Sequence, residues 1–210
     1  MTIPTMVLAS ASPRRRQLLE MLHLRVIVSP AQVQEIPLPG EAPRAYANRL
    51  ARDKARAVPG RLVLGADTIV VLDDAILEKP ADSDDALRML RLLQGRTHTV
   101  ITAVCLVADG SERHALDETR VTFRPCDDDF LQAYVATGEP ADKAGAYGIQ
   151  RWGAALVERI EGDFFGVMGL PVRLVLKLLS EAGYGYRFPT GEQGEQGERR
   201  EQGREPGATT

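Results

Sequence analysis

The spacing of apolar residues predicts that strands and helices alternate along the chain. Residues 6–9 and 25–29 have the pattern of short strands, and the leucines of residues 13–23 recur on one side of a helix between them. Residues 61–72 form a nearly continuous apolar run, which is typical of a central strand buried on both faces. The first third of the chain therefore predicts the beginning of an α/β fold.

The second half of the chain adds antiparallel pairing. Residues 97–108 and 113–124 alternate on either side of Asp109-Gly110 and predict a hairpin. Further predicted elements are helices over 43–58, 83–93, 127–136 and 171–182, and a strand over 155–161. Because hairpins are mixed with helical connections, we predict an α/β fold in which a mixed sheet with flanking helices bends around a cleft.

The composition is that of a soluble globular protein. Of 210 residues, 44% are hydrophobic, and 26 Lys and Arg stand against 29 Asp and Glu, which disfavours binding to nucleic-acid polymers. No stretch reaches the roughly 18 apolar residues of a membrane span. The first basic cluster follows the N-terminal apolar run, the reverse of a secretory signal. Two cysteines without paired spacing disfavour a disulfide framework, so we expect a cytoplasmic protein.

The last twenty residues differ in composition from the rest. Residues 191–210 hold 5 Glu and 3 Arg, repeat Gly-Glu-Gln and contain no large apolar side chain. Such a segment cannot bury enough surface to offset the entropy lost on ordering. We therefore predict one folded domain over 1–190 and a disordered polar tail over 191–210.

A candidate phosphate site lies where the first strand turns into the first helix. Ser12 can cap this helix, Pro13 suits its first turn, and Ser10, Arg14 and Arg15 add a hydroxyl and two guanidinium groups. The free N–H groups of a helix N-terminus attract anions. An ordinary capped helix with a solvated arginine face explains the same residues, and neither a P-loop nor a dinucleotide fingerprint occurs.

A carboxylate and a lysine occupy positions where apolar residues are expected. Asp67 interrupts the apolar run of residues 61–72, and Lys54 falls on the apolar stripe of the helix over 43–58. A buried charge is costly unless it meets an opposite charge, a metal or hydrogen-bond donors. Asp67 is thus either a catalytic base or metal ligand at the end of a central strand, or a turn residue bonded to backbone N–H groups.

Further charged and polar residues complete an inventory for phosphate chemistry. Glu35, Lys54 and Lys79 are each compatible with surface positions, yet with Asp67 they supply carboxylates for a divalent ion and cations for a polyphosphate. Gln150 ends a glycine-containing loop, and its amide can donate to and accept from a uracil-type base edge. A plain surface loop remains the alternative.

The order of these motifs resembles the Maf family of nucleoside triphosphate pyrophosphatases. The resemblance covers about 5–183 and rests on LASASPRRRQLL, GADTIVV, EKP, GRTHTVITAV, DKAGAYGIQ and IEGDFFGVMGLP. It implies a fold related to inosine triphosphate pyrophosphatases, with two lobes around a nucleotide cleft. It also implies a divalent cation, Mg²⁺ or Mn²⁺, and hydrolysis of a nucleoside triphosphate to the monophosphate and pyrophosphate.

The resemblance also implies roles for single residues. Asp67 matches the proton acceptor that acts on water. A role as a metal ligand, together with Glu35, also fits its chemistry. Glu35, Lys54 and Lys79 match acidic and basic catalytic positions. The phosphate-binding positions match Ser10, Arg14 and Arg15. The positions that distinguish the dTTP/UTP branch match Arg14, Thr68 and Gln150.

Four residues depart from the family pattern. Glu78 and Arg151 stand where Gly is usual, Gln34 where an acid is common, and Gly166 where Asn is usual. Because Glu78 neighbours Lys79 and Arg151 neighbours Gln150, these departures bear on affinity and base preference. The presumed catalytic set is intact.

The sequence therefore favours a pyrophosphatase that acts on dTTP and UTP and clears excess or non-standard nucleotides. The alternative is a non-catalytic, nucleotide-binding regulator of septum formation, which needs the same phosphate site. A DNA-binding role for residues 14–16 is weak because no basic stripe extends beyond them. We expect a nucleoside triphosphate as partner and neither a nucleic-acid polymer nor a membrane. The oligomeric state is left open, a homodimer included.

Overall fold

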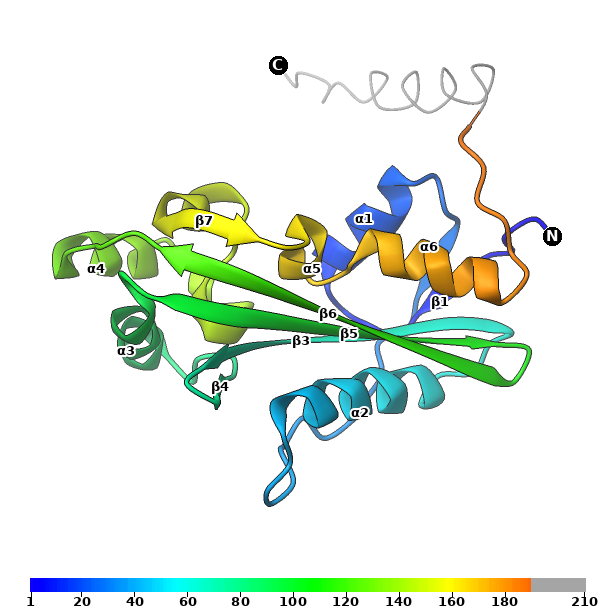
Figure 1. Cartoon of the computed structure of the whole chain (residues 1–210), viewed down its shortest axis with the longest axis horizontal. Helices are drawn as coiled ribbons and strands as arrows, with labels where there is room; N and C mark the ends of the chain where they lie inside the picture. The colour runs from blue at the N-terminus through cyan, green and yellow to red at the C-terminus, as the bar shows by residue number, and fades with distance from the viewer. Residues whose placement is uncertain (190–210) are drawn as a thin grey trace, which may run out of the picture.

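A seven-stranded mixed sheet organises the chain in this computed structural model, which describes residues 1–189 (Figure 1). The strand order is β2-β1-β3-β5-β6-β7, and β4 pairs with β3. β1 runs parallel to β2 and β3, whereas the other pairs are antiparallel. The strands are Met6–Leu8 (β1), Val26–Val28 (β2), Leu62–Leu72 (β3), Ala75–Leu77 (β4), Thr97–Ala108 (β5), Ser111–Phe123 (β6) and Val157–Glu161 (β7).

Helices cover both faces of the sheet. α2 packs on one face, and α1, α5 and α6 lie on the other, while α3 and α4 lie together at the far end (Figure 1). The helices are Pro13–Met21 (α1), Pro43–Arg56 (α2), Ser83–Leu93 (α3), Asp128–Ala136 (α4), Phe164–Met168 (α5) and Val172–Glu181 (α6). Three short 3₁₀ helices, Glu139–Asp142 (η1), Ala144–Ala146 (η2) and Arg151–Leu156 (η3), follow α4.

The buried side chains fall into three clusters that match these layers. One cluster joins the sheet to α1 and α6, a second joins it to α2, and a third fills the end formed by α3, α4 and the 3₁₀ helices. Burial of these apolar side chains, at roughly 25 cal/mol per Å², is the main favourable contribution to folding. The predicted α/β fold with a mixed sheet and flanking helices is confirmed.

A gap along one edge of β3 has direct consequences for function. β1 pairs with β3 only through Val63 and Leu64, and β4 pairs with it only from Val70 onward. In the part of the chain that the structure describes, no strand pairs with residues 65–69 on this edge. Because successive side chains of a strand point to opposite faces, Asp67 and Thr68 leave opposite faces of β3 and still reach the same opening.

Close packing of α2 against this part of β3 depends on a glycine. A Cβ on Gly65 would lie 2.2 Å from the carbonyl oxygen of Ala51 and 2.6 Å from the nitrogen of Ala55, both in the α2 backbone. The absence of a side chain lets α2 approach β3 and carry Lys54 to the strand. Gly65 therefore sets the position of Lys54 relative to Asp67.

The elements agree with the sequence-based predictions except at three places. Asp67 does not end a central strand, because β3 continues to Leu72. Residues 164–168 form the short helix α5, where the sequence analysis predicted no element, and the glycine-containing loop after α4 contains three 3₁₀ turns. The predicted disordered tail, 191–210, lies outside the described residues, and the single domain over 1–190 stays a prediction.

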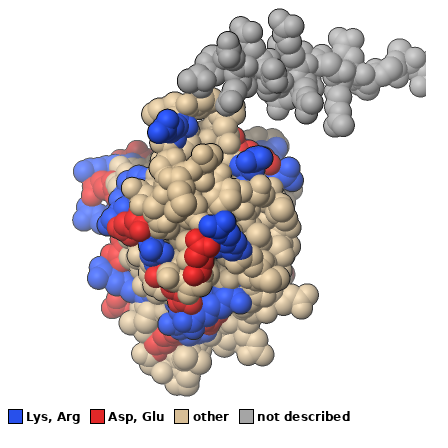
Figure 2. Space-filling view, turned by 90° about the vertical axis from the view of Figure 1, so that its right-hand side faces the viewer, with Lys and Arg blue, Asp and Glu red and all other residues tan. Residues whose placement is uncertain are grey.

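Positive and negative side chains are interspersed on the face shown in Figure 2. Elsewhere on the surface, exposed ion pairs such as Arg61 with Asp109 at 2.7 Å are screened by solvent and contribute little to stability. Among the described residues, no helix has the length and apolar character needed to cross a bilayer.

Candidate active site

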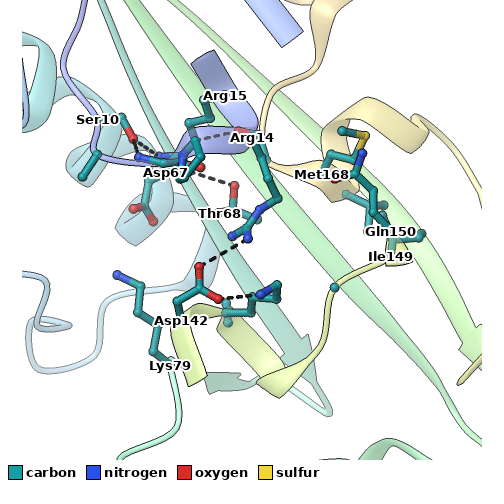
Figure 3. A pocket seen from close by; sticks show the side chains of 18 of the residues that line it. Ser10, Arg14, Arg15, Asp67, Thr68, Lys79, Asp142, Ile149, Gln150 and Met168 are labelled. Atoms are coloured by element: carbon teal, nitrogen blue, oxygen red, sulfur yellow. Dashed lines mark hydrogen bonds and ion pairs between the residues drawn. The ribbon is translucent and has the colours of Figure 1, made fainter. Parts of the chain in front are cut away.

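A cleft of about 1200 Å³ opens at the gap in the edge of β3 (Figure 3). Its walls come from the start of α1, the middle of β3, the segment after β4, the loop after α4 and the end of α5. Every site residue that the sequence analysis named lines it: Ser10, Arg14, Arg15, Glu35, Lys54, Asp67, Thr68, Lys79 and Gln150. The fold thus brings together residues that are separated by up to 140 positions in the chain.

Lys54 bridges the two carboxylates that the sequence singled out. Its Nζ lies 2.6 Å from Asp67 Oδ1 and 2.6 Å from Glu35 Oε1. Lys54 is 7% exposed and Asp67 5% exposed, so this is a buried ion pair. The lysine on the apolar stripe of α2 thus meets the opposite charge that a buried ammonium group requires. The alternative of Asp67 as a turn residue is wrong, since Asp67 lies within β3 and pairs with Lys54.

Lys79 adds a second cation on the solvent side of Glu35. Its Nζ lies 3.3 Å from Glu35 Oε2, and the side chain is largely exposed. Burial alone would raise the pKa of Glu35, but hydrogen bonds and charges from Lys54 and Lys79 outweigh it and hold this pKa below its usual value. Glu35 is therefore ionised at neutral pH and available to a cation.

Glu78 is a third carboxylate of the cleft, and the sequence analysis gave it no role. Burial raises the pKa of Glu78, and the nearby charges of Asp67 and Glu35 act in the same direction. Its Oε1 is buried and has no hydrogen-bond partner among residues 1–189. Carboxylate oxygens are the ligands that Mg²⁺ and Mn²⁺ prefer. Glu35, Asp67 and Glu78 are thus the kind of side chain that binds such an ion, and all three line this cleft.

The start of α1 is organised by Arg15 and not by the predicted cap. Ser12 makes no side-chain capping bond, and its N–H donates to Ser10 Oγ at 3.2 Å. Arg15 is 8% exposed and donates to Ser10 Oγ at 3.0 Å, to Thr68 Oγ1 at 3.1 Å and to the Gly169 carbonyl at 2.8 Å. Arg15 thus holds Ser10 and Thr68 in place, and its charge stays within the wall of the cleft.

Arg14 reaches across the cleft instead. Its Nη1 lies 3.3 Å from Asp142 Oδ2, a residue of η1 on the opposite wall (Figure 3). The guanidinium is partly exposed, so an incoming phosphate can compete with Asp142 for it. Asp142 is a further site residue that the sequence analysis missed. No local pattern marks it, because only the fold brings η1 to α1.

A hydroxyl chain continues from Thr68 to α5. Thr68 Oγ1 lies 3.0 Å from Thr102 Oγ1, and Thr102 donates to the Gly166 carbonyl at 2.8 Å. Gly166, where the family usually has Asn, has no room for a Cβ, which would lie 2.4 Å from Asp117 Oδ2. The absence of a side chain at Gly166 therefore allows α5 to pack closely on β6.

The histidines and cysteines lie outside the cleft. His98 is buried, its Nε2 lies 2.8 Å from Tyr147 Oη, and burial lowers its pKa to about 4, so it is a neutral core residue. The possible ligand atoms of Cys105, Glu112 and His114 lie within 4.8 Å of one another. Burial raises the pKa of Cys105 to about 12, and Arg56 already binds Glu112. We assign no metal to this group.

Comparisons with known proteins agree with one another. A family model described as Maf-like protein matches residues 5–182. The chain is 51% identical over 182 residues to a dTTP/UTP pyrophosphatase of Koribacter versatilis, covering 85% of this chain and 94% of the relative. It is 52% identical over 185 residues to a dTTP/UTP pyrophosphatase of Anaeromyxobacter dehalogenans, strain 2CP-1, covering 86% and 95%.

Among solved structures, the Ham1 protein of Staphylococcus aureus matches with a TM-score of 0.42 and 14% identity, covering 57% of this chain and 72% of that one. We draw no argument from a likeness at this level. The family model, by contrast, spans nearly all of the described residues, and the two relatives align over almost their whole length. The resemblance found in the sequence motifs is thereby confirmed, and the chain belongs to the Maf-like protein family.

Proposed function

We propose that this protein hydrolyses dTTP and UTP to the nucleoside monophosphate and pyrophosphate. The observation that carries the proposal is the Asp67–Lys54–Glu35 cluster, in which Asp67 and Lys54 are buried and which shares one cleft with Arg14 and Gln150. The names of the relatives, both dTTP/UTP pyrophosphatases, support the same substrates. We further propose a cytoplasmic role in clearing excess or non-standard nucleotides. A homodimer stays a prediction.

The chemistry follows from the charges of the cleft. Asp67 accepts a proton from water, the water oxygen attacks the α-phosphorus, and the bond from this phosphorus to the bridging oxygen breaks. Pyrophosphate leaves with added negative charge, which Arg14 and Lys79 stabilise. Lys54 pairs with both Asp67 and Glu35, and it holds the Asp67 carboxylate in one orientation. Arg15 supports this wall by fixing Ser10 and Thr68.

Pyrophosphatases of this type generally depend on a divalent cation. We propose that Glu35 and Asp67 hold the ion, Mg²⁺ or Mn²⁺, and that Glu78 is a third carboxylate within the same wall. When bound, the ion would neutralise charge on the phosphate oxygens. The three carboxylates and the two lysines, Lys54 and Lys79, together carry one net negative charge, so a bound divalent ion would make this side of the cleft net positive, which suits a polyphosphate.

A nucleotide panel with product identification tests the proposed activity. We expect dTTP and UTP to give monophosphate and pyrophosphate, and turnover in ¹⁸O-labelled water to place the label on the monophosphate. Release of orthophosphate would contradict the mechanism. Tight binding of dTTP without any turnover in the presence of Mg²⁺ or Mn²⁺ would favour the non-catalytic regulator of septum formation.

Metal removal tests the proposed cofactor. Treatment with EDTA followed by dialysis should abolish turnover of dTTP, because Lys54 and Lys79 balance only two of the three carboxylate charges that would then face the phosphates. Addition of Mg²⁺ or Mn²⁺ should restore turnover, and Ca²⁺ serves as a control for the geometry of the ion. Full activity in EDTA would show that Lys54, Lys79 and Arg14 suffice and would overturn the metal proposal.

A further inference from the structure

The segment around Gln150 is held by two side chains that lie outside the catalytic cluster, Tyr134 of α4 and Glu139 of η1. This inference rests on the proposed function, in which the Gln150 amide faces the base. We refer to these two side chains as the hub. Their hydrogen bonds end on both sides of Gln150, at Gly148 before it and at Trp152 and Gly153 after it.

The bonds of the hub form one connected network. Tyr134 is 5% exposed, and its Oη donates to Glu139 Oε1 at 3.1 Å and accepts from the Gly148 N–H at 3.2 Å. Glu139 Oε1 also accepts from the Gly153 N–H at 3.1 Å, and Oε2 accepts from the Trp152 N–H at 3.3 Å. An ionised carboxylate that accepts several donors strengthens each of these bonds relative to a neutral acceptor.

Packing around the hub leaves no free space for rearrangement. A Cβ on Gly153 would lie 2.1 Å from the Gly148 carbonyl oxygen and 2.7 Å from Tyr134 Oη, so the two ends of the segment close on the tyrosine. Between them, Arg151 adopts a left-handed conformation with φ of 57°. This conformation is uncommon for a residue with a side chain. The bonds of the hub to Trp152 and Gly153 follow it directly in the chain.

We propose that Tyr134 and Glu139 are positioning residues for base selection. They fix the backbone of residues 148–153, and the backbone in turn aims the Gln150 amide into the cleft. Asp67 and Lys54 belong to β3 and α2 and share no hydrogen bond with the hub. Loss of the hub should therefore change which base is accepted far more than it changes the rate of the chemical step.

The test compares Tyr134→Phe with Tyr147→Phe. Tyr134→Phe removes the hydroxyl that binds Gly148 and Glu139, and we expect the ratio of kcat/KM for UTP over CTP to fall roughly tenfold, which is the usual effect of losing about one hydrogen bond. The kcat for UTP should change less than about threefold. Tyr147→Phe removes a buried hydroxyl that binds His98 and no atom of residues 148–153. It should leave the ratio unchanged.

Two further variants, Glu139→Gln in the hub and Gln150→Ala at the residue that faces the base, complete the test. Glu139→Gln places an amide NH₂ against backbone N–H donors and should lower the same ratio, with a thermal unfolding curve confirming that the protein folds. Gln150→Ala should lower it at least as much. If Gln150→Ala lowers the ratio and both hub variants keep the wild-type value, the hub is overturned. If Gln150→Ala leaves the ratio unchanged, the proposed base contact fails, while the hydrolysis activity still stands.

Hydrogen exchange of the wild-type protein gives a readout that needs no variant. The amides of Gly148, Trp152 and Gly153 should exchange more slowly than the amide of Arg151, which the hub does not bind. Exchange of all four amides at the rate of an exposed loop would contradict the hub, whatever the variants do.

Discussion

Replacing Asp67 with Asn should lower kcat for dTTP about 100-fold or more, because an amide cannot accept the proton of the attacking water. The substitution keeps the size of the side chain and an oxygen that accepts from Lys54 Nζ, now 2.6 Å from Asp67 Oδ1. The protein should therefore fold, and its Kd for dTTP should change little. Steady-state kinetics and calorimetric binding of dTTP measure the two quantities separately.

Titration of the metal distinguishes the two roles that Asp67 can have. If Asp67 is a general base alone, Asp67→Asn lowers kcat and leaves the Mn²⁺ concentration for half-maximal activity unchanged. If Asp67 is also a metal ligand, the substitution raises that concentration as well. Asp74→Asn, at an exposed turn after β3, is the matched control and should behave as wild type. Near-normal turnover of Asp67→Asn would reassign the base to another carboxylate of the cleft, with Glu35 and Glu78 as candidates.

The sequence contains the residues of this site but not their arrangement along the sheet. The apolar run of 61–72 is strong enough to predict β3, and a lysine on an apolar stripe is enough to predict that Lys54 either extends to solvent or meets an anion. That Asp67 and Thr68 share one cleft depends on where β1 stops and β4 starts along the edge of β3. Strand register between distant segments is a tertiary property, and residue spacing within one segment does not contain it.

Contacts between distant segments also explain why the sequence did not reveal some site residues and did not show the contacts of Arg15. Arg15 looked like a phosphate ligand, yet three protein groups from separate segments occupy its guanidinium. Asp142 and Glu139 were not singled out, because an acidic residue near a glycine-containing loop is common on protein surfaces. Glu78 attracted notice only as a departure from the family. Its burial beside Asp67 and Glu35 became visible only in the fold.

The second large effect concerns the stability of the carboxylate cluster. Replacing Lys54 with Met keeps the apolar stem and removes the charge, which leaves Asp67 buried without its cation. Removing one member of a buried ion pair typically costs about 3–5 kcal/mol, and we expect a loss of this order in the free energy of unfolding at pH 7.5. Urea unfolding measures it. Lys177→Met, at an exposed pair 3.8 Å from Glu181, should change stability by less than about 0.5 kcal/mol.

The pH dependence shows whether the charge of Lys54 or its packing is responsible. In the wild type the pKa of Glu35 lies below its usual value, so the stability this group contributes is present above about pH 4.3 and is lost as pH falls through the folded-state pKa. Lys54→Met removes the largest cause of that depression. Once carboxyls are protonated they need no cation, and the difference in unfolding free energy between wild type and variant should therefore shrink when the pH is lowered from 7.5 to 4. An equal difference at both pH values would mean that the loss comes from poorer packing of the Met side chain and not from carboxylates left without their cation. The ion pair with Asp67 and Glu35 would then serve to orient the catalytic carboxylate, at no net gain in folding stability.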